Sequence, residues 1–232
     1  MSSSRKPVAL SLAALAVLAA VSSAAHARVI NHDAVVPFKE DVTAYQFKFR
    51  PRLKVTDGCV PFPAVNAAGD TGGGLQTTGA RNGHCSKSTG QVYVRAKMFN
   101  GECAVMYSWY FPKDQVIGGH RHDWEDIVLW LSECTVNARV NAIAYSGHGG
   151  YQKTTRVYMN GSNPLVEYGT DGILDHQLFA TDQSGGFQPG IRWLGLTAAA
   201  RTALTTTNFG KANVPFKDAN FDANLAKAWY RR

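Results

Sequence analysis

The chain has 232 residues and a formal net charge of +7, with 45% hydrophobic and 18% charged residues. This length fits one domain with ample residues for a core. The basic residues are scattered rather than gathered in runs, which argues against a nucleic-acid groove and leaves only a weak attraction to anionic surfaces such as a membrane or a cell wall.

The first residues have the pattern of an export signal. Arg5 and Lys6 precede an apolar stretch rich in Ala and Leu, and Ala25-His26-Ala27 offers a small-x-small cleavage site. The alternative is a membrane anchor, but the apolar stretch is shorter than the ~20 residues that a bilayer requires. We therefore predict a secretory signal peptide over residues 1–27 and a single domain over residues 28–232.

The rest of the sequence has the pattern of a β-rich domain. A long surface loop is predicted over residues 66–84, which are rich in Gly, Thr and Ala. Short aromatic or β-branched segments bounded by Gly, Asn or Pro are typical of strands. The predicted strands are Gln91–Met98, Ala104–Phe111, Asp126–Leu131, Ala138–Tyr145, Thr155–Met159 and Pro164–Tyr168. No ten-residue helices alternate with them, so we expect a mostly β fold, a two-sheet antiparallel β-sandwich.

Two helices are expected at the periphery, late in the chain. Thr197–Thr206 is rich in Ala, and Asn220–Arg231 places Phe221, Leu225 and Trp229 four residues apart. That spacing puts the three apolar side chains on one helical face.

Four cysteines, Cys59, Cys85, Cys103 and Cys134, lie in the predicted mature chain. An even number in an exported protein indicates two disulfides, and sequence alone allows three pairings. Cys59 and Cys85 flank the Gly-rich loop and are paired first, whereas Cys103 with Cys134 would tie together the ends of two predicted strands. A zinc site is the alternative, but no two of these cysteines have the close C-x-x-C spacing.

Gly119-His120-Arg121-His122-Asp123-Trp124-Glu125 is the densest group of titratable residues in the chain. We predict a charged loop here between two apolar strands, the kind of position where binding or chemistry usually occurs. If the segment is extended, His120 and His122 share one face and Asp123 and Glu125 the other. If it curls, all four converge, and Asp114 can join them from the end of the preceding strand.

Such carboxylates and imidazoles suit a divalent cation. Asp114, Asp123 and Glu125 outnumber the histidines expected to bind directly, which favours Mg²⁺ or Ca²⁺, with histidines holding coordinated waters. A salt-bridged surface turn, in which Arg121 pairs with an acid, is the alternative. His148 and His176 add imidazoles, although each alone is more often a structural residue.

The sequence contains no HExxH, G-x-S-x-G or P-loop motif. We therefore expect no enzymatic activity. A metal-dependent hydrolase remains the alternative that the His-Asp-Glu cluster alone suggests, because a metal-bound water is a nucleophile.

The motif over residues 119–125, together with Ala104–Asp114, resembles the hallmark of the necrosis- and ethylene-inducing-peptide-like proteins (NLPs). The resemblance extends over nearly the whole mature chain, through residues 30–38, 148–151, 188–191 and 210–216. Four cysteines resemble the family's second type.

This resemblance implies a fold of two antiparallel sheets similar to actinoporins and fungal lectins, and a secreted cytolysin that lyses plant plasma membranes. The receptor class is glycosyl inositol phosphoryl ceramide, a sphingolipid whose sugar head group meets a metal-bearing cleft. A plant immune receptor is a further implied partner, and the protein is expected to be a monomer in solution.

The resemblance also implies roles for individual residues. Asp114 and Glu125 match direct metal ligands, and His120 and Asp123 match residues that hold the metal's waters. His122, His148, Asp175 and His176 are the remaining candidates for contacts with the ligand. The stretch Ala104–Glu125 resembles the pattern that plant immune receptors detect.

One spacing differs from the family pattern. Asp114 and His120 are six positions apart, two fewer than in typical members. The shortened loop over residues 115–119 motivates a second hypothesis, a non-lytic sugar-binding protein that acts as an immune-triggering pattern.

Overall fold

The structure, a computed structural model, describes residues 27–172 and 175–231. The predicted signal peptide lies outside this part except for its last residue. Within the described residues no helix is both long and apolar enough to cross a membrane.

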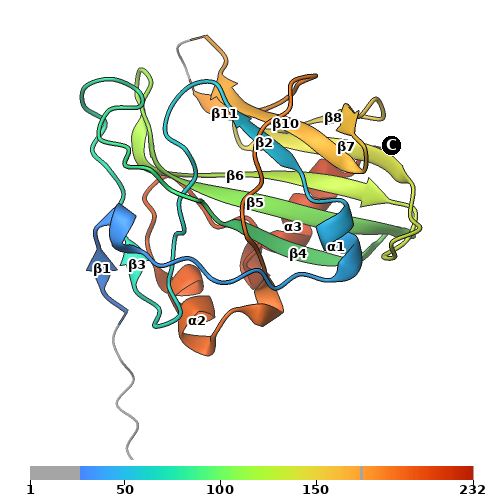
Figure 1. Ribbon diagram of the computed structural model, residues 1–232, viewed down its shortest axis with the longest axis horizontal. Coiled ribbons are helices and arrows are strands. Elements are labelled where there is room, and N and C mark those ends of the chain that lie inside the picture. The colour runs from blue at the N-terminus through green and yellow to red at the C-terminus, as the bar shows by residue number, and fades with distance from the viewer. Residues whose placement is uncertain (1–26, 173–174, 232) are drawn as a thin grey trace, which may run out of the picture.

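Two main sheets form the fold (Figure 1). The large sheet has the order β12 (Gly190–Arg192), β4 (Val92–Phe99), β5 (Glu102–Asp114), β6 (His120–Leu131), β7 (Val140–Gly147) and β8 (Gly150–Thr154). The small sheet has the order β11 (His176–Ala180), β10 (Asn163–Thr170) and β2 (Arg52–Val55), and β9 (Met159–Asn160) also pairs with β10. A separate pair joins β1 (Val29–Ile30) to β3 (Thr71–Gly72).

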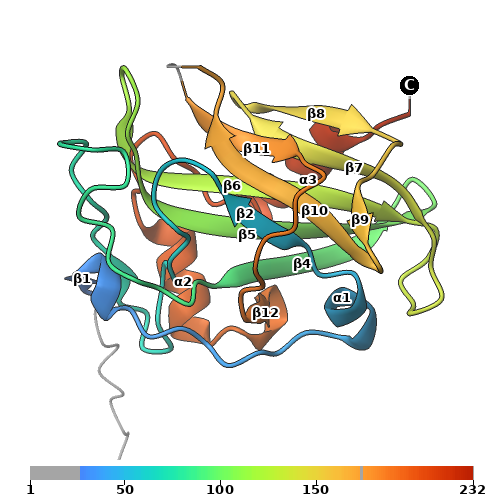
Figure 2. The same cartoon turned by 45° about the horizontal axis from the view of Figure 1, so that its top comes forward.

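Three α-helices and two short 3-10 helices complete the described chain. The α-helices are α1 (Ala44–Lys48), α2 (Ala198–Thr206) and α3 (Asp218–Ala228), and the 3-10 helices are η1 (His32–Ala34) and η2 (Trp193–Gly195). The small sheet covers one face of the large sheet, and α2 and α3 lie on the other (Figures 1 and 2).

The central strand β5 is buried along its whole length because the large sheet is covered on both faces. Trp109 and Phe111 belong to the core between the sheets, and Met106 and Tyr110 to the core beneath the helices. The sequence Ala104–Phe111 has apolar residues at both its odd and its even positions, which face opposite sides of the sheet, as a strand buried on both faces requires.

The structure confirms the mostly β, two-sheet class and corrects some of its details. The charged motif does not form a loop but begins β6, which pairs with β5 from Asp114↔His120 to Cys103↔Leu131. The predicted strand over 155–159 is wrong, because β8 ends at Thr154 and only Met159 at its end is in a strand. The sandwich is not wholly antiparallel, since β12 runs parallel to β4 and β2 runs parallel to β10.

The predicted surface loop over 66–84 is wrong in part, because it contains β3 and residues 69–72 are buried where β3 pairs with β1. The other predicted strands and helices agree with the structure within a few residues. α2 covers the Ala-rich segment, and α3 starts two residues before the predicted helix and ends three residues before it. Both predicted disulfides are present, Cys59–Cys85 and Cys103–Cys134. The second one joins the start of β5 to the chain just after β6.

Candidate functional site

The site begins where β6 leaves the regular strand conformation. His122 has a positive φ of 64°, which is uncommon for a residue other than Gly and interrupts the alternation of faces. Its Nδ1 lies 2.6 Å from the Tyr110 hydroxyl, and its ring packs edge-on against Phe209 on the helix side. The prediction that His120 and His122 point together is therefore wrong, since His120 turns toward Asp114.

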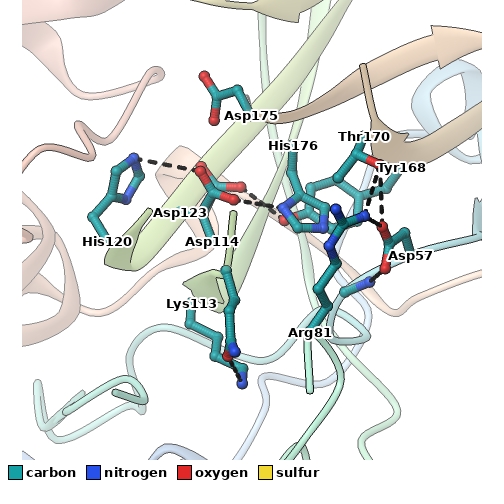
Figure 3. A network of polar contacts seen from close by, with 12 residues as sticks. Asp57, Arg81, Lys113, Asp114, His120, Asp123, Tyr168, Thr170, Asp175 and His176 are labelled. Atoms are coloured by element: carbon teal, nitrogen blue, oxygen red, sulfur yellow. Dashed lines mark hydrogen bonds and ion pairs between the residues drawn. The ribbon is translucent and has the colours of Figure 1, made fainter. Parts of the chain in front are cut away.

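Asp114, His120 and Asp175 form a three-residue group that could hold a cation. One ligand atom from each lies within 4.8 Å of the others. The Asp114 carboxylate accepts a hydrogen bond of 2.5 Å from Nδ1 of His176, and its other oxygen lies 3.8 Å from Nε2 of His120. Figure 3 shows Asp114 between the two imidazoles. The large sheet supplies Asp114 and His120, and the chain leading into the small sheet supplies Asp175 and His176.

Asp123 and Glu125 lie beside this group but each has a protein partner. Asp123 accepts a hydrogen bond of 2.9 Å from the Tyr168 hydroxyl, and Glu125 accepts one from the Ser146 hydroxyl. Burial and then repulsion from Asp114 raise the pKa of Asp123 to about 7. Burial and then repulsion from Asp123 raise the pKa of Glu125 well above its usual range.

The other two carboxylates of the group respond to each other. Burial, a hydrogen bond with Asp114 and repulsion from it raise the pKa of Asp175 to about 6. Burial alone would raise the pKa of Asp114, but hydrogen bonds from His176 and Asp175 outweigh it and hold that pKa below its usual value. Asp114, Asp123 and Asp175 are thus close enough to repel one another, and the positive charge near them does not offset the effects of burial and repulsion on Asp123 and Asp175.

An aromatic stack fixes the position of the His176 ring. Phe111 and Tyr168 are stacked at 3.6 Å, and the imidazole of His176 is stacked on Tyr168 at 5.0 Å. The other side of the ring faces Gly58, where a Cβ would lie 2.8 Å from Nε2. His176 is fully buried, and its Nε2 has no hydrogen-bond partner. The ring is therefore held by shape and by its bond to Asp114.

Two cationic residues hold the loops around the group. Lys113 is 1% exposed and donates to the carbonyls of Thr78 and Ala80. Arg81 pairs with Asp57, whose carboxylate also accepts a hydrogen bond from Thr170, at the end of β10 (Figure 3). The predicted surface loop over 66–84 is therefore attached at its C-terminal end to both sheets.

A groove of about 330 Å³ opens over the cation group. Its sheet wall contains His120, Asp123, Glu125 and Asp175, and the turn with His148, whose Nδ1 lies 3.3 Å from Asp175. The rest of its lining comes from the segment that follows α2 and from α3 and includes Lys211, Asn213, Asn224 and Lys227.

This donor set fits a hard divalent cation. Oxygen ligands with one imidazole are acceptable to Mg²⁺ or Ca²⁺. A cation would offset the repulsion from Asp114 that adds to burial in raising the pKa values of Asp123 and Asp175. Asp114, His120 and Asp175 would hold it. A bound cation would supply a positive centre that accepts hydroxyl oxygens of a ligand.

The structure brings most of the candidate residues into one place. The four predicted metal residues Asp114, His120, Asp123 and Glu125 lie together, as do His148, Asp175 and His176, whereas His122 faces the helix-side core. Sequence reasoning missed Tyr168, Arg81, Asp57 and the two groove lysines. Only their proximity in the fold reveals them, because none lies in a charged motif.

Comparison with known proteins agrees with this geometry. The family model "Necrosis inducing protein (NPP1)" matches residues 43–228. NLP effector protein 10 of Phytophthora capsici is 44% identical over 231 residues, which cover 93% of this chain and 98% of that protein.

Two solved structures superpose over nearly the whole described domain. NLPPya in complex with mannosamine is 42% identical with a TM-score of 0.82, covering 88% of this chain and 100% of that one. NLPPya has also been solved with glucosamine. Non-toxic HaNLP3 is 40% identical with a TM-score of 0.83, covering 87% and 100%. With its two disulfides of the four-cysteine second type, the chain belongs to the necrosis-inducing NPP1, or NLP, family.

Proposed function

We propose that this protein is a secreted, cation-dependent cytolysin that binds sphingolipid head groups of plant plasma membranes, of the glycosyl inositol phosphoryl ceramide class, and disrupts the membrane. One observation carries the proposal: the group of Asp114, His120 and Asp175 opens into a groove in a family of which a solved member holds amino sugars. Mg²⁺ or Ca²⁺ is the proposed cation.

The proposed mechanism involves binding without covalent chemistry. Asp114, His120 and Asp175 would hold the cation, with Asp123 and Glu125 beside them. The cation supplies a positive centre for sugar hydroxyls. His148, on the neighbouring turn, lies 3.3 Å from Asp175 and lines the groove that would receive the sugar. The protein acts as a monomer until it reaches the membrane.

Dye release from vesicles tests this proposal. Vesicles with and without the plant sphingolipid are mixed with protein in Mg²⁺ or Ca²⁺, and then with a chelator. We expect release that needs both the lipid and the cation. Asp114→Asn should abolish release, whereas Asp182→Asn, which changes an exposed acid in another loop, should leave it unchanged. Release that persists in chelator from the folded protein would contradict the proposal.

A second function is favoured by two specific observations. The segment between Asp114 and His120 is short, and a solved relative is described as non-toxic. In this alternative the protein binds the head group and triggers plant immune receptors without lysis. Binding to sphingolipid vesicles by flotation, without dye release, would support it, and absence of binding would remove it.

A further inference from the structure

The backbone nitrogen of Arg28, the first residue after the predicted signal peptide, points at a carboxylate. It donates a hydrogen bond of 3.2 Å to Oδ1 of Asp70. The guanidinium of the same residue donates to Oδ1 and Oδ2 of Asp70 at 3.2 and 3.3 Å. Asp70 is nearly buried, whereas the Arg28 side chain is exposed. Arg28 therefore meets a nearly buried acid through its backbone as well as through its side chain.

The Asp70 carboxylate is fixed by its own turn. Oδ1 of Asn66 accepts hydrogen bonds of 3.0 Å from the amides of Ala68 and Asp70, and Nδ2 of Asn66 donates to Oδ2 of Asp70 at 3.2 Å. The turn also packs against α2, because a Cβ added at Gly69 would lie 3.0 Å from the carbonyl oxygen of Ala199. The carboxylate is thus a preformed acceptor, held in place by residues that follow it or precede it in the same turn.

The strand that starts after Arg28 is bonded to the segment that follows Asp70. β1 runs parallel to β3, and the two lie side by side at one end of the molecule (Figure 1). The amide of Gly73 donates to the carbonyl of Ile30 at 2.7 Å, and the carbonyl of Gly73 accepts a hydrogen bond of 2.6 Å from Arg121 in β6. Contacts that fix residue 28 therefore act, through β1 and β3, on a segment that is bonded to the strand of the candidate site.

Processing changes the chemistry of the Arg28 nitrogen. Hydrolysis of the Ala27–Arg28 peptide bond by a signal peptidase adds one water, which leaves a carboxylate on Ala27 and an ammonium group on Arg28. The amide nitrogen offers Asp70 one neutral donor at 3.2 Å, the long end of the usual range. An ammonium group at that nitrogen has three donors and a full charge. Charge-assisted hydrogen bonds are shorter, ~2.7–2.9 Å, and stronger than neutral ones. Residues 27 and 28 are exposed, so the new terminus has room to turn toward the carboxylate.

We propose that Asp70 is the binding site for the ammonium group of the mature N-terminus, so that removal of the signal peptide creates an ion pair that fastens β1 and β3 beside the strand of the candidate site. This inference rests on the predicted signal peptide and on the secretion that belongs to the proposed function. It makes the exact cleavage position matter, because a chain cut one residue earlier carries its charge ~3.8 Å further along the backbone.

Two proteins that differ by one residue test this binding site. Both are expressed behind a removable fusion, which leaves either Arg28 or Ala27 as the first residue. The rate at which an acylating reagent labels the α-amine is measured from about pH 6 to pH 10, around its ordinary pKa, by mass spectrometry of the N-terminal peptide. The midpoint of the profile reports the pKa of the amine, and the plateau at high pH reports its accessibility.

We expect the protein that begins at Ala27 to show the ordinary α-amine pKa of about 7.7–8.0. In the protein that begins at Arg28, the amine meets the Asp70 carboxylate, which stabilises its charged form, and the guanidinium of its own residue, which opposes it. The nearer carboxylate should raise the pKa, so that labelling at neutral pH is about three- to tenfold slower. Salt should reduce this difference, because the pair is close to solvent.

The variants assign the effect to one carboxylate. Asp70→Asn should restore the faster labelling, whereas Asp182→Asn, which changes an exposed acid in another loop, should leave the slow rate unchanged. Arg28→Gln removes the guanidinium and keeps the α-amine, so labelling should stay slow. The full chain, secreted by its own signal peptide, should have an intact mass that begins at Arg28.

Two results would overturn the inference. Equal midpoints in the proteins that begin at Arg28 and at Ala27 refute the ion pair, even if Asp70→Asn does not fold. A secreted chain whose mass places its first residue elsewhere refutes the link to signal-peptide removal. Neither measurement involves dye release, so a protein that shows the raised pKa but releases no dye supports the ion pair and contradicts only the proposed cytolysis.

Discussion

Gly58 is the position where one added methyl group tests how the candidate site is held. An alanine Cβ would lie 2.8 Å from Nε2 of His176 and 3.2 Å from Cε1 of Tyr168, and Gly58 has a φ of +80°. Ordinary contact begins at 3.4 Å, so the imidazole must retreat by at least 3.4 − 2.8 = 0.6 Å. His176 is fully buried between Tyr168 and this glycine, so it has no open space into which to move.

The expected loss of unfolding free energy in Gly58→Ala has two parts. The left-handed backbone costs an alanine roughly 1–2 kcal/mol, and overpacking a dense core costs about 1–3 kcal/mol more. Gly101→Ala is the matched control, because Gly101 has a φ of +83° and nothing within 4 Å of its added Cβ. Gly101→Ala should therefore show the first part alone, and Gly58→Ala the sum.

Thermal unfolding and cation titration measure the two consequences. At ~2–4 °C of Tm per kcal/mol for a protein of this size, Gly58→Ala should unfold some 2–12 °C below Gly101→Ala. It should also weaken Ca²⁺ or Mg²⁺ binding, because displacing His176 moves the Asp114 carboxylate that it holds. Equal Tm values for the two variants, with unchanged cation affinity, would refute the account of how His176 is fixed.

Three other predictions follow from the structure. Burial lowers the pKa of His122 from 6.5 to about 4. Between these pH values the folded state binds fewer protons than the unfolded state. The contribution of His122 to the free energy of unfolding, about 3 kcal/mol, should therefore be lost as the pH falls from 6.5 to 4. Urea unfolding across that range should show a smaller pH slope for His122→Asn, which tolerates the positive φ, and equal slopes would contradict the assignment. Replacing Cys103 and Cys134 by Ala opens a disulfide with a sequence separation of 31, and the unfolding free energy should drop by about 3–4 kcal/mol in the chain-entropy model; no loss in denaturant titration would rule that model out here. Lys113→Met removes charged hydrogen bonds to the carbonyls of residues 78 and 80. We expect the free energy of unfolding to fall by about 2–3 kcal/mol and protease cleavage over 76–81 to become faster. An unchanged cleavage rate would show that other contacts hold the loop.

The sequence predicted the two-sheet class and the strands with strong apolar patterns. Ala104–Phe111 was recognisable because a strand buried on both faces is apolar at nearly every position, and only Ser108 interrupts this run. Short pieces such as β2, β11 and β12 were not predicted, since three to five residues carry too little periodicity and these strands depend on partners distant in sequence.

The motif over 119–125 shows the limit of local reasoning about the site. Its acids and His120 lie close together in the fold, but the segment was predicted as a loop although residues 120–125 are the first half of β6. The charges are tolerated in a strand because Tyr168 and Ser146 meet Asp123 and Glu125 from other elements. The positive φ of His122, which separates it from His120, has no local signature in the sequence.

The placement of the cation group at the boundary of the two sheets has a mechanical consequence. Asp114 and His120 belong to the large sheet, while Asp175 and His176 enter the small sheet. An ion bound by residues from both sheets would cross-link them and resist sliding of one sheet across the other. Force applied across the sandwich, for example in a single-molecule pulling experiment, should then meet a rupture threshold that rises with divalent cation concentration, as mass action requires for an ion that binds only the closed arrangement.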